Sequence, residues 1–376
     1  MMKSLKIGFD AKRAFYNHRG LGNYSRETIR IMNEQAGQND YLLFTPKTKN
    51  AIQFPLGPTC RIVKPSGLWD TSFSSAWRTF GQCKEIKAEQ LDIYHGLSHE
   101  LPYGIEKIKV RTVVTMHDVI FLKNPELYPF FDRYTFRKKY SRACAIADKI
   151  VAISQQTKND IIEYLPVDEQ KIVVVYQGCN PVFKKSIPEE TKQSVIRKYN
   201  LPDNYLLIVG AIERRKNHEL ILKALHVGKL DIPLVIIGRP SAYKNELIRL
   251  ISQYHLENKV IFLYPVETTE LPAIYQSATL FVYPSLYEGF GIPILEALTS
   301  CVPVITSKGS CLEETGGDAT CYVSPDDPEE LADAIRRITE NNEITAQMIA
   351  KGQTHSLLFS DENIAQALLA IYENRS

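Results

Sequence analysis

Short runs of Val, Ile and Leu recur along the chain, and stretches with helical character separate them. Runs such as Leu206–Val209 and Leu234–Ile237 are strand-length and almost continuously apolar. Such runs are typical of strands buried on both faces of a parallel sheet, because a sheet with one wet face alternates apolar and polar residues. Strands that alternate with helices predict an α/β fold of the doubly wound type. No apolar run reaches the ~18 residues of a membrane span.

The pattern predicts two parallel sheets, one in each half of the chain. The strands expected in the first half are Lys6–Ala11, Tyr41–Thr45, Arg61–Lys64, Leu91–His95, Thr112–Met116, Lys149–Ile153 and Lys171–Tyr176. Those expected in the second half are Tyr205–Val209, Leu234–Gly238, Lys259–Leu263, Thr279–Tyr283, Pro303–Thr306 and Cys321–Val323. Helices are expected between them, including Tyr24–Glu34, Asp132–Ile146, Thr157–Tyr164, Thr191–Tyr199, His218–His226, Lys244–Tyr254, Glu270–Gln276 and Pro328–Thr339.

A domain boundary is expected near residue 184. The chain has 376 residues, which is enough for two domains. The stretch from Gly178 to Glu190 is rich in turn-forming and charged residues, as linkers are. We therefore expect one Rossmann-like domain over residues 1–183, a second over 184–360, and a C-terminal helix over 361–376 that packs back toward the first domain. Ligands are expected in a cleft between the domains, at the carboxyl ends of the strands.

One predicted strand runs directly into the segment YPSLYEGFGIPILE. A helix is expected to start beside Pro293, because a proline in the first turn loses no hydrogen bond. The N–H groups of that turn and of Gly289 and Gly291 form a site for an anion. Glu288 and Glu296 are candidates for binding sugar hydroxyl groups, since a carboxylate accepts several hydrogen bonds. The alternative is that Glu288 caps the helix and Glu296 is an ordinary surface residue.

A cluster of cations follows the first strand predicted in the second half of the chain. Arg214, Arg215 and Lys216 lie in the segment ERRKN, ahead of a predicted helix. Arginine offers two donors to a phosphate, and lysine acts as a mobile point charge. The segment therefore suits a diphosphate, although a solvated turn would have the same composition.

Two further candidate sites lie in the first half. His117 stands at the end of a predicted strand, where it could contact a hydroxyl or phosphate group, although a lone histidine is more often structural. Gly20 and Gly22 precede the helix expected from Tyr24. They do not form an NAD fingerprint, because Lys12–Arg19 intervenes after the strand and no acid ends the second strand. A flexible surface loop is the alternative.

These segments resemble the donor-binding motifs of the retaining glycosyltransferases of family 4, which have the two-domain GT-B fold. The likeness covers nearly the whole chain and is strongest over residues 111–183 and 205–330. It implies that Glu288 contacts the transferred sugar and that Glu296 holds the ribose hydroxyl groups. It also implies that the diphosphate is bound by Arg215, Lys216, Gly20, Gly22 and the N–H groups of Gly289, Phe290 and Gly291. His117 would contact the sugar, and the backbone at Val266 would contact the base. Glu314 would lie near the nucleotide.

The chain departs from the commonest family form at one position. That form has an arginine directly after the glycine of the first strand of the second domain, and here the position is Ala211. Arg214 is a further candidate to compensate for it. For Glu314 a structural role is an equal alternative. His95, which ends another predicted strand, could line the acceptor side, and a position in an ordinary turn is an equal alternative for it.

The resemblance predicts a retaining glycosyltransferase that moves a hexose from a nucleotide sugar to a glycan or lipid-linked acceptor. The forms RKN and SLYEGFG resemble those of mannosyltransferases of polysaccharide biosynthesis that use GDP-mannose, so mannose is favoured and UDP-glucose is second. Neither a cofactor nor a metal is expected, because cations and helix N-termini can balance the diphosphate. A non-catalytic two-domain sugar-binding protein is the remaining alternative.

Charge is unevenly distributed along the chain. Residues 1–185 carry 28 Lys and Arg against 18 Asp and Glu, whereas residues 186–376 carry 17 against 25. A basic first domain suits an anionic acceptor, such as a polyprenyl-linked glycan, or a membrane surface. The stretch Tyr128–Arg142 mixes aromatic and basic residues as interfacial helices do, although aromatic packing of an ordinary exposed helix would also explain it.

Localisation and the remaining partners follow from what the sequence lacks. The basic residues are not clustered in a recognition motif, so no nucleic acid is expected. The first residues contain no apolar signal core, and the seven cysteines form no C-x-x-C pair. We therefore expect a cytoplasmic protein, with peripheral contact at the inner face of the membrane.

Overall fold

The computed structural model describes residues 4–66 and 76–374, and it divides the chain into two compact units. Unit 1 comprises Met1–Gly178 and Phe359–Ser376, and unit 2 comprises Cys179–Leu358. The chain thus leaves unit 1 once, forms all of unit 2, and returns to unit 1 with its last helix. The boundaries expected from the sequence, after residues 183 and 360, lie a few residues further along.

Unit 1 contains a seven-stranded parallel sheet in the order β3-β2-β1-β4-β5-β6-β7. Its register places Ile93 opposite both Ile7 and Arg111. The strands are β1 (Lys6–Asp10), β2 (Asp40–Phe44), β3 (Cys60–Val63), β4 (Ile93–Gly96), β5 (Arg111–Met116), β6 (Lys149–Ala152) and β7 (Ile172–Val174). The helices are α1 (Lys12–Tyr16), α2 (Gly20–Gln35), α5 (Gln82–Glu89), α6 (Ile120–Lys123), α7 (Phe130–Ile146), α8 (Gln155–Tyr164) and α17 (Asp361–Tyr372).

Unit 2 contains a six-stranded parallel sheet in the order β10-β9-β8-β11-β12-β13. Its register places Leu206 opposite both Leu234 and Leu280. The strands are β8 (Leu206–Val209), β9 (Leu234–Ile237), β10 (Val260–Leu263), β11 (Leu280–Tyr283), β12 (Val304–Ser307) and β13 (Thr320–Val323). The helices are α9 (Glu189–Tyr199), α10 (His218–Val227), α11 (Lys244–Gln253), α12 (Leu271–Ser277), α13 (Ile292–Thr299), α14 (Cys311–Gly316), α15 (Pro328–Thr339) and α16 (Asn342–Ser356).

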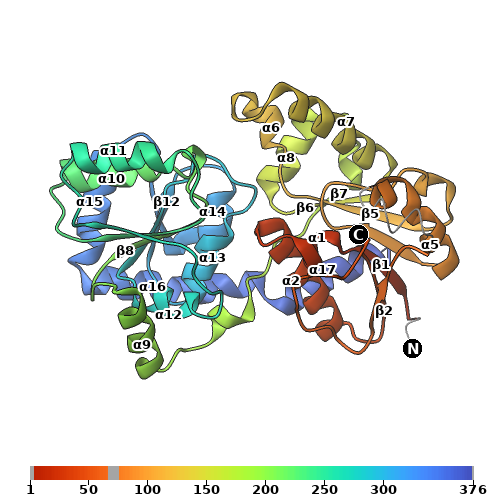
Figure 1. Cartoon of the computed structure of the whole chain (residues 1–376), viewed down its shortest axis with the longest axis horizontal. Coiled ribbons are helices and arrows are strands. Elements are labelled where there is room, and N and C mark those ends of the chain that lie inside the picture. The colour runs from red at the N-terminus through yellow and green to blue at the C-terminus, as the bar shows by residue number, and fades with distance from the viewer. Residues whose placement is uncertain (1–3, 67–75, 375–376) are drawn as a thin grey trace. The chain divides into compact units, whose positions relative to one another are not determined.

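Helices cover both faces of each sheet, and this explains the apolar runs in the sequence (Figure 1). Residues 206–208, 234–236 and 280–282 are fully buried. Two Rossmann-like parallel sheets confirm the predicted fold class. Every predicted strand is present with bounds within two residues of those expected, because continuous apolar runs are a local signal.

Each sheet has one point at which the order of its strands reverses. In unit 1 the reversal lies between β1 and β4, and in unit 2 between β8 and β11. The loops that leave the carboxyl ends of two such strands turn to opposite faces of the sheet and leave a crevice, where ligands of α/β proteins bind. A ligand site is therefore expected at each of these two pairs of strand ends.

The prediction for the glycine segment was wrong in its local structure. Gly20 and Gly22 were expected in a loop, but they form the first turn of α2, which starts at Gly20 rather than at Tyr24. Helix packing accounts for Gly22, because a Cβ there would lie 1.8 Å from the carbonyl oxygen of Asn17. A Cβ at Gly20 would meet nothing within 4 Å.

Candidate active site

Three charged side chains of unit 2 meet at the carboxyl ends of β8 and β11. Arg215 and Lys216 follow β8, and Glu288 follows β11. Arg215 Nη1 lies 2.7 Å from Glu288 Oε2, and the ammonium group of Lys216 pairs with Glu288 Oε1. The structure therefore brings three of the predicted residues into direct contact at the reversal point of the sheet.

Two hydroxyl groups complete the surroundings of Glu288. Ser285 Oγ donates to Oε1 at 2.6 Å, and Tyr283 OH donates to the same oxygen at 3.0 Å. Lys216 Nζ also donates to Tyr283 OH at 2.6 Å. The side chain of Glu288 is only 11% exposed, and a carboxylate is stable at such a site only when it is paired and hydrogen-bonded. We call Arg215, Lys216, Tyr283, Ser285 and Glu288 the Glu288 cluster.

Backbone contacts fix the two loops that carry the Glu288 cluster. The N–H of Leu286 donates to Arg215 O at 2.8 Å, and Ser285 Oγ lies 3.0 Å from the same carbonyl oxygen. Arg215 Nη1 donates in turn to Tyr287 O at 2.5 Å. The loops after β8 and β11 are thus held together by hydrogen bonds in both directions.

The charges of the Glu288 cluster control its protonation. Burial by itself would raise the pKa of Glu288, but the charges of Lys216 and Arg215 lower this pKa to about 2. Burial lowers the pKa of Lys216, and the charge of Glu288 opposes that shift. Burial would also lower the pKa of Arg215, but Glu288 raises it above its usual range. Glu288 is therefore ionised at neutral pH and is a weak base.

Helix α13 begins directly after the Glu288 cluster, as the sequence predicted. Its N-cap is Gly291, which has a φ of 100°, in the region that only glycine adopts without strain. A Cβ at Gly291 would also lie 3.1 Å from Leu312 Cδ2. Gly289 is half-buried and Phe290 is buried, and Thr315 Oγ1 donates to Phe290 O at 2.5 Å. The segment that leads into the helix is therefore packed in a fixed conformation.

Glu296 lies further along α13 and is half-buried. Tyr275 OH, from α12, donates to its Oε2 at 3.0 Å. Burial raises the pKa of Glu296 to about 7, although the bond from Tyr275 opposes the shift. Among residues 4–66 and 76–374, no hydrogen bond or ion pair joins Glu296 to Glu288.

The remaining candidates of unit 2 lie outside the Glu288 cluster. Arg214 is 64% exposed and pairs with Glu246 instead. Val266 is half-buried in the loop after β10. Glu314 is half-buried in α14, where its carbonyl oxygen lies 3.2 Å from His355 Nε2.

His117 lies in unit 1, directly after β5, and is buried. Its Nε2 donates to Leu97 O at 2.9 Å, and its backbone N–H donates to His99 Nε2 at 3.0 Å. Burial lowers the pKa of His117 to about 4, although the bond to Leu97 opposes the shift. The ring is therefore neutral at pH 7, with its proton on Nε2 and with Nδ1 as a hydrogen-bond acceptor.

His95, considered above as an acceptor contact or an ordinary turn, is a core residue of unit 1. Its Nδ1 lies 2.7 Å from Tyr372 OH, and its Nε2 lies 2.8 Å from Thr115 Oγ1. Thr115 Oγ1 also lies 3.0 Å from Tyr24 OH, and the ring of Tyr24 meets His117 edge-on at a centroid distance of 4.5 Å. Helix α17 is thus tied to the surroundings of His117.

Sequence reasoning missed Tyr283, Ser285 and His99. The first two were recognisable as hydroxyl residues just before Glu288, at the end of a predicted strand. His99 follows another predicted strand, but its partner His117 lies 18 residues away. His99 also has a φ of 62°, which is uncommon outside glycine and frequent at functional sites.

Residues 4–66 and 76–374 contain no candidate metal centre and no candidate membrane span. No group of three or more histidine, cysteine or carboxylate side chains in these ranges is placed to hold a metal ion. None of the helices described there has both the length and the apolar character needed to cross a membrane.

Comparison with known sequences gives two family matches. Residues 19–183 match the model described as Glycosyltransferase Family 4, and residues 189–355 match the model described as Glycosyl transferases group 1. The O-antigen chain mannosyltransferase B of Escherichia coli is 30% identical over 287 residues, which make up 75% of this chain and 74% of that protein.

Comparison with solved structures gives matches over nearly the whole chain. The sucrose-phosphate synthase of Thermosynechococcus elongatus has a TM-score of 0.79 and 20% identity, and the match covers 99% of both chains. Anabaena HepE in complex with UDP has a TM-score of 0.73 and 16% identity, and covers 99% of this chain and 100% of its own. At these identities the likeness is one of fold.

Proposed function

Because the chain belongs to the glycosyltransferases of Family 4 and group 1, we propose that it is a retaining enzyme that transfers mannose from a nucleoside diphosphate sugar. The observation that carries the proposal is the Glu288 cluster, in which two cations and a carboxylate stand at the reversal point of the sheet of unit 2. The mannosyltransferase at 30% identity supports mannose as the sugar.

Each candidate residue has a part in this proposal. Arg215, Lys216 and the N–H groups of residues 289–291 bind the diphosphate, together with Gly20 and Gly22 at the start of α2. Glu288 accepts a sugar hydroxyl through Oε2, since Oε1 already accepts three hydrogen bonds. His117 accepts a sugar hydroxyl through Nδ1. Glu296 binds the ribose, the backbone at Val266 binds the base, and Glu314 lies near the nucleotide.

The proposed reaction breaks the bond between the anomeric carbon and the diphosphate oxygen. Negative charge then develops on the leaving diphosphate, and the preorganised charges of Arg215 and Lys216 stabilise it. The proposal includes no metal, because Arg215, Lys216 and the N–H groups at the start of α13 donate hydrogen bonds to the diphosphate oxygens directly.

Retention follows from attack on the face that the leaving group departs from. The acceptor hydroxyl oxygen bonds to the anomeric carbon, and its proton passes to the leaving phosphate. A covalent route would need Glu288 as the nucleophile, but the two cations that lower its pKa to about 2 also make its carboxylate a weak one.

The donor can be tested by thermal unfolding with UDP, GDP and ADP and their sugars, without metal. A ligand at 100 times its dissociation constant stabilises the protein by about 2.7 kcal/mol. We expect a shift with GDP and GDP-mannose, whereas a shift with UDP alone would favour a glucosyltransferase. If no nucleotide shifts the transition, the proposal is wrong.

The role of Glu288 can be tested by turnover. Glu288→Gln should lose most of its activity and still bind the nucleotide, because Arg215 and Lys216 remain. The matched control Glu246→Gln, at an exposed pair of the same unit, should keep wild-type turnover. Full activity of Glu288→Gln would exclude the assigned role.

For the acceptor we propose a glycan on a polyprenyl carrier, reached by peripheral contact with an anionic membrane. On α7, Phe130, Phe131 and Tyr134 are 66%, 81% and 64% exposed, whereas Phe136 and Tyr140 pack on the core. Exposed Arg137 and Lys138 lie on the same helix. Aromatic rings next to basic groups fit the interface of an anionic bilayer.

Cosedimentation with vesicles tests this contact. The protein should bind phosphatidylglycerol vesicles more than phosphatidylcholine vesicles, and Phe131→Ser should weaken the binding. Tyr264→Ser, which changes an exposed aromatic residue of unit 2, is the matched control. Equal binding of both variants would place the contact elsewhere.

A further inference from the structure

A second charged cluster lies in unit 1, at the carboxyl ends of β1 and β4. Ser98 Oγ accepts hydrogen bonds from two guanidinium groups, from Arg13 Nε at 3.0 Å and from Arg78 Nη2 at 3.2 Å. Arg78 also pairs with Asp10 at 2.5 Å and with Glu100 at 3.1 Å. This is the point at which the order of strands in unit 1 reverses, so it corresponds in topology to the place of the Glu288 cluster in unit 2.

Cations outnumber carboxylates in this second cluster. Lys139 Nζ lies 3.6 Å from Glu100 Oε1. Asp10 is therefore paired with Arg78, and Glu100 with Arg78 and Lys139. Lys12 and Arg13 form no ion pair with any residue in the described ranges. Burial, and then the charge of Arg78, lowers the pKa of both Lys12 and Arg13. Positive charge is therefore concentrated here without an equal amount of negative charge.

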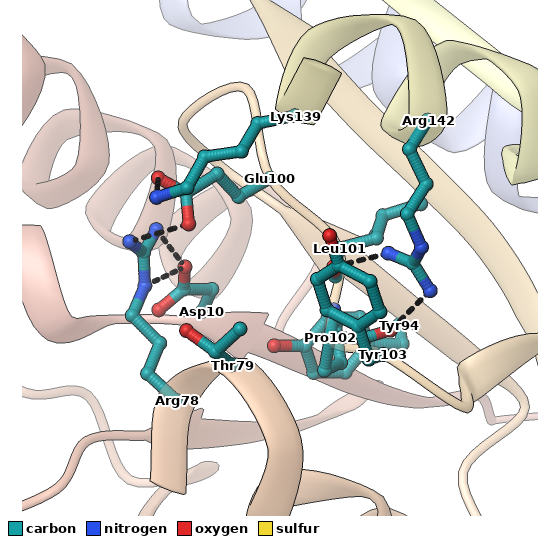
Figure 2. Close-up of a pocket in the computed structure, with 10 residues that line it drawn as sticks. All are labelled: Asp10, Arg78, Thr79, Tyr94, Glu100, Leu101, Pro102, Tyr103, Lys139 and Arg142. Atoms are coloured by element: carbon teal, nitrogen blue, oxygen red, sulfur yellow. Dashed lines mark hydrogen bonds and ion pairs between the residues drawn. The ribbon is translucent and has the colours of Figure 1, made fainter. Parts of the chain in front are cut away.

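A small cavity of about 20 Å³ is lined in part by Asp10, Arg78, Glu100 and Lys139 of this cluster. Figure 2 shows Arg78, Asp10, Glu100 and Lys139 gathered on one side of it, and Arg142 on the other. Arg142 donates to the carbonyl oxygens of the loop after β4, at 3.0 and 3.2 Å, and pairs with Glu106. The charge of Arg142 is therefore balanced locally, and the surplus lies among Lys12, Arg13, Arg78 and Lys139.

We propose that Lys12, Arg13, Arg78 and Lys139, the Arg13 cluster, bind a phosphate or diphosphate group of the acceptor. The inference rests on the proposed function, and it assigns to unit 1 an anion site separate from that of the donor. Half-buried guanidinium and ammonium groups bind phosphate oxygens through charge-assisted hydrogen bonds. The charge of Arg13 also reaches His117, whose pKa it lowers, so an anion bound here would lie near the residue proposed to contact the sugar.

The donor is a weaker match for the Arg13 cluster. Its diphosphate already has Arg215, Lys216 and the start of α13 in unit 2. An acceptor attached to a polyprenyl diphosphate brings a second diphosphate, which needs cations of its own. The excess positive charge of residues 1–185 is consistent with that second anion.

Calorimetric titration with inorganic pyrophosphate tests the proposal when the nucleotide site is first saturated with GDP and UDP. Wild-type protein should then bind pyrophosphate, and Lys12→Gln/Arg13→Gln should bind it at least about tenfold more weakly. Arg78 is left intact, because its removal would leave Asp10 buried without its ion pair. Lys107→Gln/Lys109→Gln, which removes two exposed cations of unit 1 outside the cluster, is the matched control and should bind as wild type does.

Three outcomes would overturn the proposal. The first is wild-type protein that binds nucleotide but no pyrophosphate, and the second is a Lys12/Arg13 variant that binds pyrophosphate like the control. The third is a Lys12/Arg13 variant that loses nucleotide affinity about tenfold, which would assign the cluster to the donor. Failure of the wild-type protein to bind any nucleotide would instead refute the proposed function, and the two failures are therefore distinguishable.

Discussion

Replacing Glu288 by glutamine should destabilise unit 2 by about 3 kcal/mol at pH 7. The substitution keeps the size of the side chain but removes the negative charge between Arg215 and Lys216. The pKa of Glu288 falls from 4.5 to about 2 in the folded protein. A difference of about 2.5 units, at ~1.36 kcal/mol each, favours the charged form by about 3 kcal/mol. Removing one partner of a buried ion pair typically costs ~3–5 kcal/mol, which agrees with this figure.

The lowered pKa of Glu288 also determines how the stability difference between wild type and Glu288→Gln depends on pH. A carboxylate with a lowered pKa contributes stability above its unfolded pKa of 4.5, and the contribution is lost as the pH falls toward the folded pKa of about 2. The difference between wild type and Glu288→Gln should therefore be constant at neutral pH. It should shrink below a pH of about 4.5 and close near pH 2.

Urea unfolding can separate the two units. Buried Trp77 belongs to unit 1 and the sequence of unit 2 contains no tryptophan, so tryptophan fluorescence reports unit 1, whereas circular dichroism reports both units. Glu288→Gln should shift the transition seen by circular dichroism and leave the fluorescence transition unchanged. Glu246→Gln, at a pair whose side chains are 40% and 64% exposed, should cost no more than about 1 kcal/mol. Equal losses in the two variants, or a loss in Glu288→Gln that persists near pH 2, would refute the reasoning.

Three further predictions concern other parts of the chain. Nucleotide affinity should rise as the pH increases through about 7, because burial raises the pKa of Glu296 to that value and the ionised carboxylate accepts hydrogen bonds from ribose hydroxyls better than the protonated form does. Calorimetry of Glu296→Gln should show no such rise. Gly291→Ala should destabilise unit 2 by about 1–3 kcal/mol in thermal unfolding, whereas Gly20→Ala, where a Cβ has open space, should not. Tyr372→Phe should destabilise unit 1 by about 1–3 kcal/mol, seen by tryptophan fluorescence, because it leaves His95 Nδ1 buried without a partner.

The sheets and the three charged residues of the Glu288 cluster could be predicted because their signals are local. Each strand is marked by its own apolar run, and parallel strands bring their carboxyl ends to one edge of a sheet. Arg215, Lys216 and Glu288 could therefore be placed at one edge of the second sheet from the sequence alone. That the carboxylate pairs with both cations could not be predicted, because the sequence does not specify which side chains of two loops face each other.

The errors and omissions arise where contacts between separate elements determine the outcome. Glycine is a poor helix former, so Gly20 and Gly22 favoured a loop. The helix instead packs so closely against the backbone of Asn17 that only a residue without a side chain fits at position 22. The pair of His95 and Tyr372 spans 277 residues, and no local pattern announces it.

The Glu288 cluster and the Arg13 cluster differ in net charge, and added salt can reveal this difference. In unit 2, Arg215 and Lys216 are offset by Glu288 and Glu213, so a diphosphate meets a cluster with little net charge. The Arg13 cluster of unit 1 retains uncompensated positive charge. Attraction between net charges is screened within about 10 Å at 0.1 M salt, whereas hydrogen bonds at close range are affected much less. Added salt should therefore weaken pyrophosphate binding with the nucleotide site filled more steeply than it weakens nucleotide binding. If both affinities fall with the same slope, the distinction between a neutral donor site and a cationic acceptor site is wrong.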